Sequence, residues 1–119
     1  MSDFGTTLRE KRRAAGISQR ELADRAGVDF SYISKLENGR LPAPSAETIV
    51  RLSRILGCPP EEMLAPAKKF PSSVEHGISG EPAALRFLDD ASKLNLSADE
   101  WEQLRGTLHG LRSDPKDRS

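Results

Sequence analysis

The sequence lacks the features that stabilise secreted proteins or hold proteins in a membrane. It contains a single cysteine, Cys58, so it cannot form an internal disulfide. We interpret this cysteine as a small apolar filler rather than a redox sensor, because no second cysteine could resolve an oxidised one. No window approaches the roughly 18 consecutive apolar residues of a membrane helix, and the N-terminus lacks the basic-then-apolar pattern of a signal peptide. These absences predict a cytoplasmic protein with no membrane span.

An excess of one charge is also missing. Across the 119 residues, 18 Lys and Arg balance 18 Asp and Glu, whereas a nucleic-acid-binding domain is commonly basic. Phosphate contact requires only a local positive field, because physiological salt screens charges beyond roughly 8 Å. The charge balance therefore leaves nucleic-acid binding open, but it predicts weak non-specific binding.

The chain carries no motif of a catalytic, metal or cofactor site. Its two histidines, His76 and His109, have no carboxylates or cysteine at the spacing of a metal site. No glycine-rich phosphate loop or nucleophile motif occurs. We therefore expect no enzymatic activity, no cofactor and no metal.

What the sequence does have is a series of short amphipathic helical patterns. A first helix is predicted from about Phe4 to Ala15, and a second and a third within residues 17–39. A fourth follows Ser45 and a fifth starts at Pro60, an N1 proline. Two prolines between the third and fourth helices exclude helix there. The first 65 residues therefore predict a domain of five helices.

Residues 17–39 read ISQRELADRAGVDFSYISKLENG and predict two helices joined by a tight turn. Ser18 and Glu21 have the spacing of a capping box, which starts a helix at the next residue. Gly27 can adopt the left-handed conformation that ends this helix, and Asp29 can cap the next one. Two helices joined by a short turn containing glycine form the geometry of a DNA-reading motif.

The second helix of this pair has two distinct faces. Ile33 and Leu36 lie one turn apart and predict the buried side. The outer face carries Phe30, Ser31, Ser34 and Lys35. This outer face is the predicted DNA-reading surface.

Four segments in a fixed order resemble a known family. They are S-Q-x-E-L-A, A-G-V, Y-I-S-x-L-E-N-G-R and L-G-x-x-x-E-x-x-L. Over Phe4 to Leu64 the chain resembles the Cro/C1-type helix-turn-helix family, also called the XRE family. The resemblance implies an all-α, five-helix, lambda-repressor-like domain that binds double-stranded DNA, here residues 1–66.

The resemblance also implies roles by position. Base reading is implied for Phe30, Ser31 and Lys35, with Ser34 adjacent. Backbone phosphate contact is implied for Gln19, Tyr32, Asn38 and Arg40. Lys35 suits the O6 and N7 acceptors of guanine, Ser31 either kind of base, and Phe30 a thymine methyl. Relatives commonly carry polar residues at the Phe30 position, so packing of this ring on the domain surface stays an alternative.

In the family, the equivalents of Arg12 and Glu37 form a partly buried ion pair that joins the first helix to the third. We expect this structural pair here, because an unpaired carboxylate beside phosphates would repel DNA. Arg9, Lys11 and Arg13 are open between a solvated helix face and direct phosphate contact.

Beyond Pro66 the composition predicts a linker over residues 67–81 and a helical hairpin over residues 82–112. The remaining residues, 113–119, are predicted to be disordered. The hairpin's apolar stripes include Leu85, Leu88, Trp101, Leu104, Leu108 and Leu111. A hairpin of this size cannot bury both stripes within itself. We expect a homodimer interface; docking on the first domain and binding of another protein are the alternatives.

Together these features predict a sequence-specific transcriptional regulator, and they favour a repressor that binds a palindromic operator as a dimer. Two alternatives stay open. One is an antitoxin-type or protease-released repressor whose hairpin docks a protein partner. The other is an interaction module without DNA binding.

Overall fold

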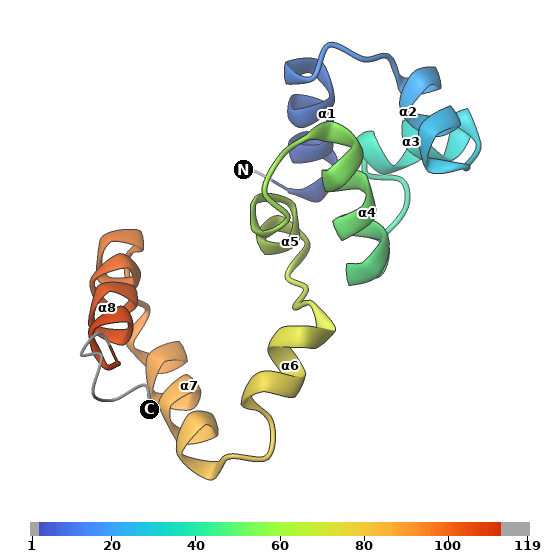
Figure 1. The fold of residues 1–119 in the computed structure, drawn as a ribbon. Coiled ribbons are helices and arrows are strands. Elements are labelled where there is room, and N and C mark those ends of the chain that lie inside the picture. The colour runs from blue at the N-terminus through green and yellow to red at the C-terminus, as the bar shows by residue number, and fades with distance from the viewer. Residues whose placement is uncertain (1–2, 113–119) are drawn as a thin grey trace. The chain divides into compact units, whose positions relative to one another are not determined.

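The computed structural model describes residues 3–112, and the regular secondary structure of this region is entirely helical (Figure 1). Its helices are α1 (Phe4–Ala14), α2 (Gln19–Ala26), α3 (Phe30–Glu37), α4 (Ala46–Leu56), α5 (Glu61–Ala67), α6 (Ser72–Ile78), α7 (Pro82–Leu94) and α8 (Ala98–Gly110). The chain divides into two compact units with the boundary between Gly77 and Ile78. The predicted all-α class is confirmed. The predicted disordered tail, residues 113–119, lies outside the described residues.

Local signals place most helix ends within a residue of their prediction. The Ser18 hydroxyl accepts a hydrogen bond from the Glu21 N–H at 3.0 Å and starts α2. This helix ends at Gly27, whose φ of 71° is in the left-handed region. Helix α4 begins after Ser45, as predicted, and Pro60 is the N-cap of α5 rather than its first residue.

Two predicted caps differ in the structure: the capping box of α2 forms only in part, and the Asp29 side-chain cap of α3 does not form. The Glu21 carboxylate does not complete a capping box with Ser18; its Oε2 accepts a hydrogen bond from Arg25 Nη2 at 2.5 Å instead. An arginine one turn later offers a charged donor, which competes with the backbone N–H of the cap. Asp29 occupies the N-cap position of α3, but its side chain makes no capping hydrogen bond.

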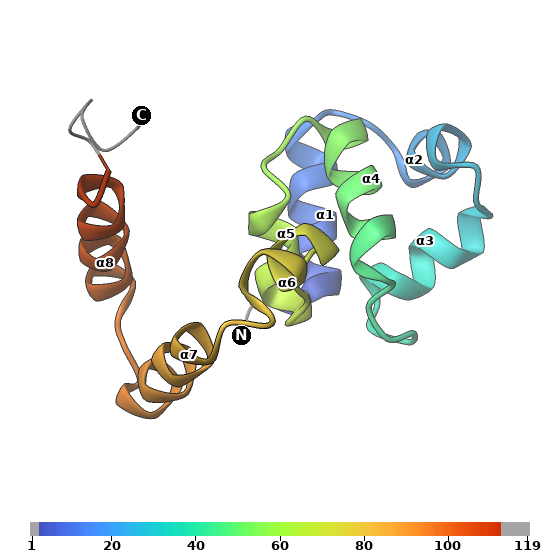
Figure 2. The same cartoon turned by 60° about the horizontal axis from the view of Figure 1, so that its bottom comes forward.

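The first unit encloses a hydrophobic core to which α1 to α5 all contribute. Helix α1 contacts α3 and α5, and α2 contacts α3 and α4 (Figure 2). The core residues are Phe4, Leu8, Leu22, Ala23, Ala26, Ile33, Leu36, Ile49, Leu52, Leu56, Met63 and Leu64. Cys58 packs against this core, and burial raises the pKa of its thiol. The predicted buried side of α3 is therefore present.

A glycine allows α1 and α3 to approach closely. Gly5 lies in the first turn of α1 and is buried. A Cβ at this position would lie 2.4 Å from the Leu36 carbonyl oxygen and 2.9 Å from that of Glu37. Such distances are far inside van der Waals contact, so only glycine fits without a shift of the backbone. Gly5 thus sets where the C-terminal end of α3 rests on α1.

The segment predicted as a linker, residues 67–81, is not wholly extended. It contains α6, whose first turn is closed by a hydrogen bond from the Val74 N–H to the Pro71 carbonyl at 3.0 Å. Proline is favoured at a helix start because its fixed φ suits the helix and its missing N–H is not needed there. No residue of α6 is buried, and with seven residues the helix is too short for an apolar period to identify it from the sequence.

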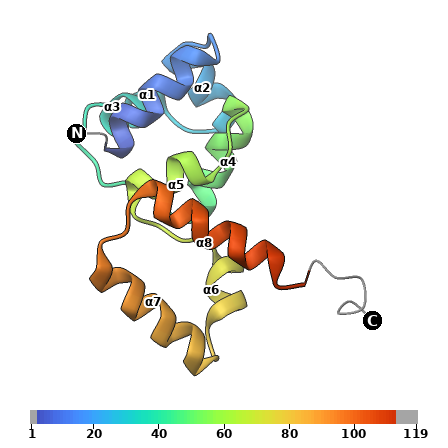
Figure 3. The same cartoon turned by 90° about the vertical axis from the view of Figure 1, so that its left-hand side faces the viewer.

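The second unit contains α7 and α8, joined through residues 95–97 (Figure 3). Pro82 is the first residue of α7. The predicted capping box of α8 is complete: the Glu100 N–H donates to Ser97 Oγ at 3.2 Å, and the Ser97 N–H donates to Glu100 Oε1 at 2.9 Å. Ala91 is the only buried residue of these two helices. None of the described helices combines the length and the apolar character needed to cross a membrane.

Candidate nucleic-acid interface

Helix α3 separates an anchored face from a free one. Ile33 and Leu36 are buried in the core, whereas Ser31 and Lys35 are exposed. Ser34 is half-buried, and its hydroxyl lies 3.5 Å from Asn38 Nδ2. The structure therefore leaves most of the predicted reading face open to a ligand.

The C-terminal end of α3 is held by a buried carboxylate. The Glu37 side chain is 0% exposed and pairs with Arg12, whose Nε lies 2.6 Å from Oε2 and whose Nη2 lies 3.0 Å from Oε1. Arg12 also donates from Nη1 to the Ile17 carbonyl at 3.0 Å. Burial alone would raise the pKa of Glu37, but the hydrogen bonds from Arg12 and Gln19 outweigh it and the pKa is lowered. Glu37 is therefore a charged tether between α1 and α3.

Gln19, the first residue of α2, joins the same carboxylate. Its Nε2 donates to Glu37 Oε1 at 2.9 Å, and its side chain is half-buried. A primary amide has two N–H donors, so one remains for another acceptor. The family resemblance predicts that Gln19 contacts a phosphate. In the structure its side chain ties the start of α2 to the end of α3.

Arg9 has a structural partner that its sequence context did not reveal. Its Nη2 donates to Asn38 Oδ1 at 2.8 Å, and its Nε lies 3.3 Å from Glu37 Oε1. The structure thus gives Arg9 a third role, beside the solvated face and the phosphate contact between which the sequence left the choice open. Arg9 occupies the Asn38 oxygen and Asn38 Nδ2 donates to Ser34 Oγ at 3.5 Å, so one N–H of the Asn38 amide remains for another acceptor.

The other cations near the motif differ in their pairing. Lys11 forms an ion pair with Glu62, which links α1 to α5. Arg13 and Arg40 are exposed. Tyr32 is half-buried and packs against the core, so only part of its ring is accessible.

An open hollow with several arginines lies where α1, α2 and α3 come together. Its volume is about 480 Å³, and its lining residues are Arg9, Arg12, Arg13, Ser18, Gln19, Arg20 and Phe30. The Arg20 guanidinium stacks over the Phe30 ring, with Cζ 4.6 Å from the ring centroid. Sequence reasoning missed this pair, although an arginine in the first turn of α2 and an unusual aromatic at the start of α3 were both visible.

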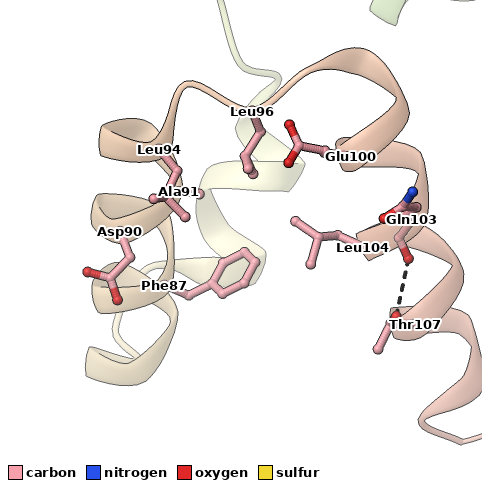
Figure 4. A pocket seen from close by; sticks show the side chains of 9 residues that line it. All are labelled: Phe87, Asp90, Ala91, Leu94, Leu96, Glu100, Gln103, Leu104 and Thr107. Atoms are coloured by element: carbon pink, nitrogen blue, oxygen red, sulfur yellow. Dashed lines mark hydrogen bonds between the residues drawn. The ribbon is translucent and has the colours of Figure 1, made fainter.

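The second unit presents a different kind of surface. Figure 4 shows Phe87 of α7 and Leu104 of α8 pointing toward each other across an open hollow of about 340 Å³. A neighbouring apolar hollow is lined by Phe87, Trp101, Leu104, Leu108 and Leu111. Four of the six predicted interface residues therefore gather with Phe87. The other two, Leu85 and Leu88, are exposed on α7 and line neither hollow.

Comparison with known proteins agrees with this geometry. A family model described as helix-turn-helix matches residues 8–63. The uncharacterized HTH-type transcriptional regulator RghRB of Bacillus subtilis (strain 168) is 37% identical over 113 residues, which cover 87% of this chain and 81% of that protein. The chain belongs to the Cro/C1-type helix-turn-helix family of transcriptional regulators. The family predicted from the sequence is thereby confirmed.

Two further proteins, one a sequence relative and one a solved structure, are similar to this chain. The HTH-type transcriptional repressor RghR of the same Bacillus strain is 34% identical over 64 residues, 54% of this chain and 47% of that protein. A solved structure, the SinR protein/SinI protein complex, superposes with a TM-score of 0.51 at 22% identity, covering 93% of this chain and 99% of that one. At 22% identity, the similarity to the SinR protein/SinI protein complex shows a shared fold alone. The match to RghRB covers 87% of this chain, which is more than the length of the first unit, residues 1–77. The match therefore extends into the second unit.

Proposed function

We propose that this helix-turn-helix protein is a sequence-specific transcriptional repressor that binds a two-fold symmetric DNA operator as a homodimer. The observation that supports this proposal is the setting of α3. One face of the helix is buried, the other is exposed at Ser31 and Lys35, and its C-terminal end is tied to α1 through Glu37. A rigidly held helix with polar and cationic side chains facing outward suits insertion into a major groove. The name of the relative RghR, a transcriptional repressor, supports the sign of regulation.

Base recognition would come from the outer face of α3, at Phe30, Ser31, Ser34 and Lys35. Lys35 is exposed and can reach the O6 and N7 acceptors of guanine, while a serine hydroxyl can donate or accept. These contacts would set the sequence preference, because each base pair presents a distinct pattern in the major groove.

Phosphate contacts would come from Gln19, Tyr32, Asn38 and Arg40. Gln19 and Asn38 each keep an amide N–H free for an outside acceptor after their contacts within the protein. Arg40 is exposed beyond the end of α3. Such contacts fix the register of the protein on DNA and carry no base information themselves.

Dimerisation would use the apolar surface of α7 and α8. Leu108 is 63% exposed and Trp101 44% exposed, which leaves large apolar side chains in water. A second copy of the same two helices would cover them through a symmetric contact. Two DNA-binding units held this way would read half-sites about 34 Å apart, or a multiple of that distance.

A second candidate keeps DNA binding but gives the α7–α8 surface to another protein. The SinR protein/SinI protein complex, which shares the fold, is an assembly of two different proteins. If the α7–α8 surface here takes a heterologous partner, that partner would regulate operator binding by competing with dimerisation.

The proposal is tested by selecting fragmented genomic DNA on the purified full chain and sequencing what is retained. We expect a palindromic motif. Lys35→Ala should lose the preference at one base pair of each half-site, at a cost of about 1–3 kcal/mol on the preferred sequence. Lys69→Ala, which removes the same charge outside α2 and α3, is the matched control and should retain the full motif.

The outcomes separate the parts of the proposal. No enrichment over bulk DNA would overturn sequence-specific binding. A single, unpaired half-site would retain DNA binding and remove the dimer. Equal losses of Lys35→Ala on every sequence would remove Lys35 from the base-reading residues.

A further inference from the structure

The contact between Arg20 and Phe30 joins the two helices of the DNA-reading motif at one end. Arg20 is the second residue of α2 and Phe30 the first residue of α3. The guanidinium carbon lies 4.6 Å from the ring centroid, within the range of a cation–π interaction. Phe30 is still 39% exposed, so the stacked pair lies at the surface.

Arg20 differs from Arg9, Arg12 and Arg25 in its hydrogen bonding. Arg9 and Arg12 both donate to the Glu37 carboxylate, and Arg25 donates to Glu21. Within residues 3–112, the Arg20 side chain makes no hydrogen bond or ion pair, and its ring contact is its one specific interaction. Stacking occupies a face of the guanidinium and leaves the in-plane N–H donors free.

The surroundings of these free donors favour an anion. The hollow that Arg20 lines also contains Arg9, Arg12 and Arg13. Glu37 balances only part of this charge, because one carboxylate serves two of the arginines. The local charge is therefore positive although the whole chain is neutral. A planar guanidinium held by a ring can give two parallel hydrogen bonds to the oxygens of a phosphate.

We propose that Arg20 contacts a DNA backbone phosphate and that Phe30 is the platform that holds it there. The inference rests on the DNA binding proposed above and deepens it. It changes the task of Phe30 from reading a thymine methyl to positioning a residue of the preceding helix. It also accounts for an aromatic side chain at a position where a direct reader is commonly polar.

The experiment measures affinity as a function of salt, because each phosphate contact contributes about 0.9 to the slope of log K against log salt. The full chain is titrated into fluorescent duplexes of the selected operator and of a scrambled sequence. Arg20→Ala should make the slope less steep by about 0.9 per bound subunit. Its affinity should fall by the same factor on every operator variant. The matched control is Arg25→Ala, whose guanidinium is paired with Glu21; its slope should stay unchanged.

The platform is tested with Phe30→Leu, which keeps an apolar side chain and removes the ring. We expect a loss that is uniform over operator variants. The double variant Arg20→Ala/Phe30→Leu should be no weaker than Arg20→Ala alone, because the ring acts through the arginine. Phe30→Tyr keeps the ring and should retain the affinity. Thermal unfolding of each variant checks that the fold is intact.

Three results would overturn the inference: an unchanged slope for Arg20→Ala, additive losses in the double variant, or a Phe30→Leu loss confined to operators that retain one particular thymine. The last would return Phe30 to base reading. Wild-type protein that does not distinguish operator from scrambled DNA would overturn the proposed function itself. Specific wild-type binding combined with an unchanged Arg20→Ala slope would overturn only the inference.

Discussion

The two units of the chain both contain helices with apolar side chains on them, and they differ in what covers those side chains. In the first unit, α1 to α5 bury their apolar residues against one another. In the second, α7 and α8 bury only Ala91, and Leu85, Leu108 and Leu111 are each more than half exposed. Amphipathic periodicity therefore predicts that a helix has an apolar face. It does not predict whether that face is buried by other helices of the same chain.

The units also differ in how polar groups are used. The buried charges of the first unit are connected across helices, in the Glu37 network of α1, α2 and α3. The hydrogen bonds of α7 and α8 link residues close in the chain, such as Ser97 and Glu100. Contacts between distant residues give the first unit a defined tertiary structure, whereas local caps support single helices.

The largest expected effect tests the network of the first unit. Glu37→Ala leaves Arg12 buried without its carboxylate, so the free energy of unfolding should fall by about 3–5 kcal/mol. Urea unfolding of the full chain measures it. Glu10→Ala, an exposed glutamate of the same α1, should change stability by less than about 0.5 kcal/mol. Equal effects of the two variants would contradict the tether.

The next effect tests the uncovered face of the second unit. Trp101→Ala should weaken self-association by about 2 kcal/mol or more, because buried tryptophans dominate interfaces. Sedimentation at several protein concentrations measures this, and Lys93→Ala on α7 is the exposed control. If the wild-type protein is monomeric at every concentration, the result would instead favour a different protein as the partner that buries the apolar surface of α7 and α8.

A smaller effect compares the same substitution in both units. Gly5→Ala places a Cβ against the carbonyls of α3 and should cost about 1–3 kcal/mol of stability. Gly106→Ala in α8 meets open space and should gain about 0.5–1 kcal/mol, since alanine is the better helix former. Thermal unfolding monitored by circular dichroism compares them. Similar shifts of the unfolding temperature for both variants would contradict the close approach of α1 and α3 at Gly5.

The smallest effect concerns pH. The pKa of Glu37 is lower in the folded protein than the ordinary glutamate value of about 4.3, so the unfolded chain binds more protons in the window below that value. Its stabilising contribution is therefore complete above this window and is lost as the pH falls through the folded pKa. Unfolding curves from pH 7 to the acid range should show this loss, and Glu37→Gln should flatten it. A parallel decline in both proteins would assign it to other carboxylates.

Sequence patterns predicted the helices of the first unit well, because their ends are local. Ser18, Gly27 and Ser45 act within one turn of their own positions, and the helices they bound begin and end where spacing placed them. Helix α6 escaped prediction because its seven residues are too few to show an apolar period. The cap at Glu21 was only half right, since Arg25 competes for the same carboxylate.

The sequence by itself determined the helical class, the reading motif and the family, because these depend on side-chain periods, caps and residue order within short segments. Only the tertiary structure decided that Gly5 receives the end of α3, that Arg9 and Gln19 share Glu37, and that Arg20 lies on Phe30. These contacts join residues on different helices. Spacing along a chain fixes the face of a helix on which a side chain lies, but the side chain that meets it depends on how the helices pack.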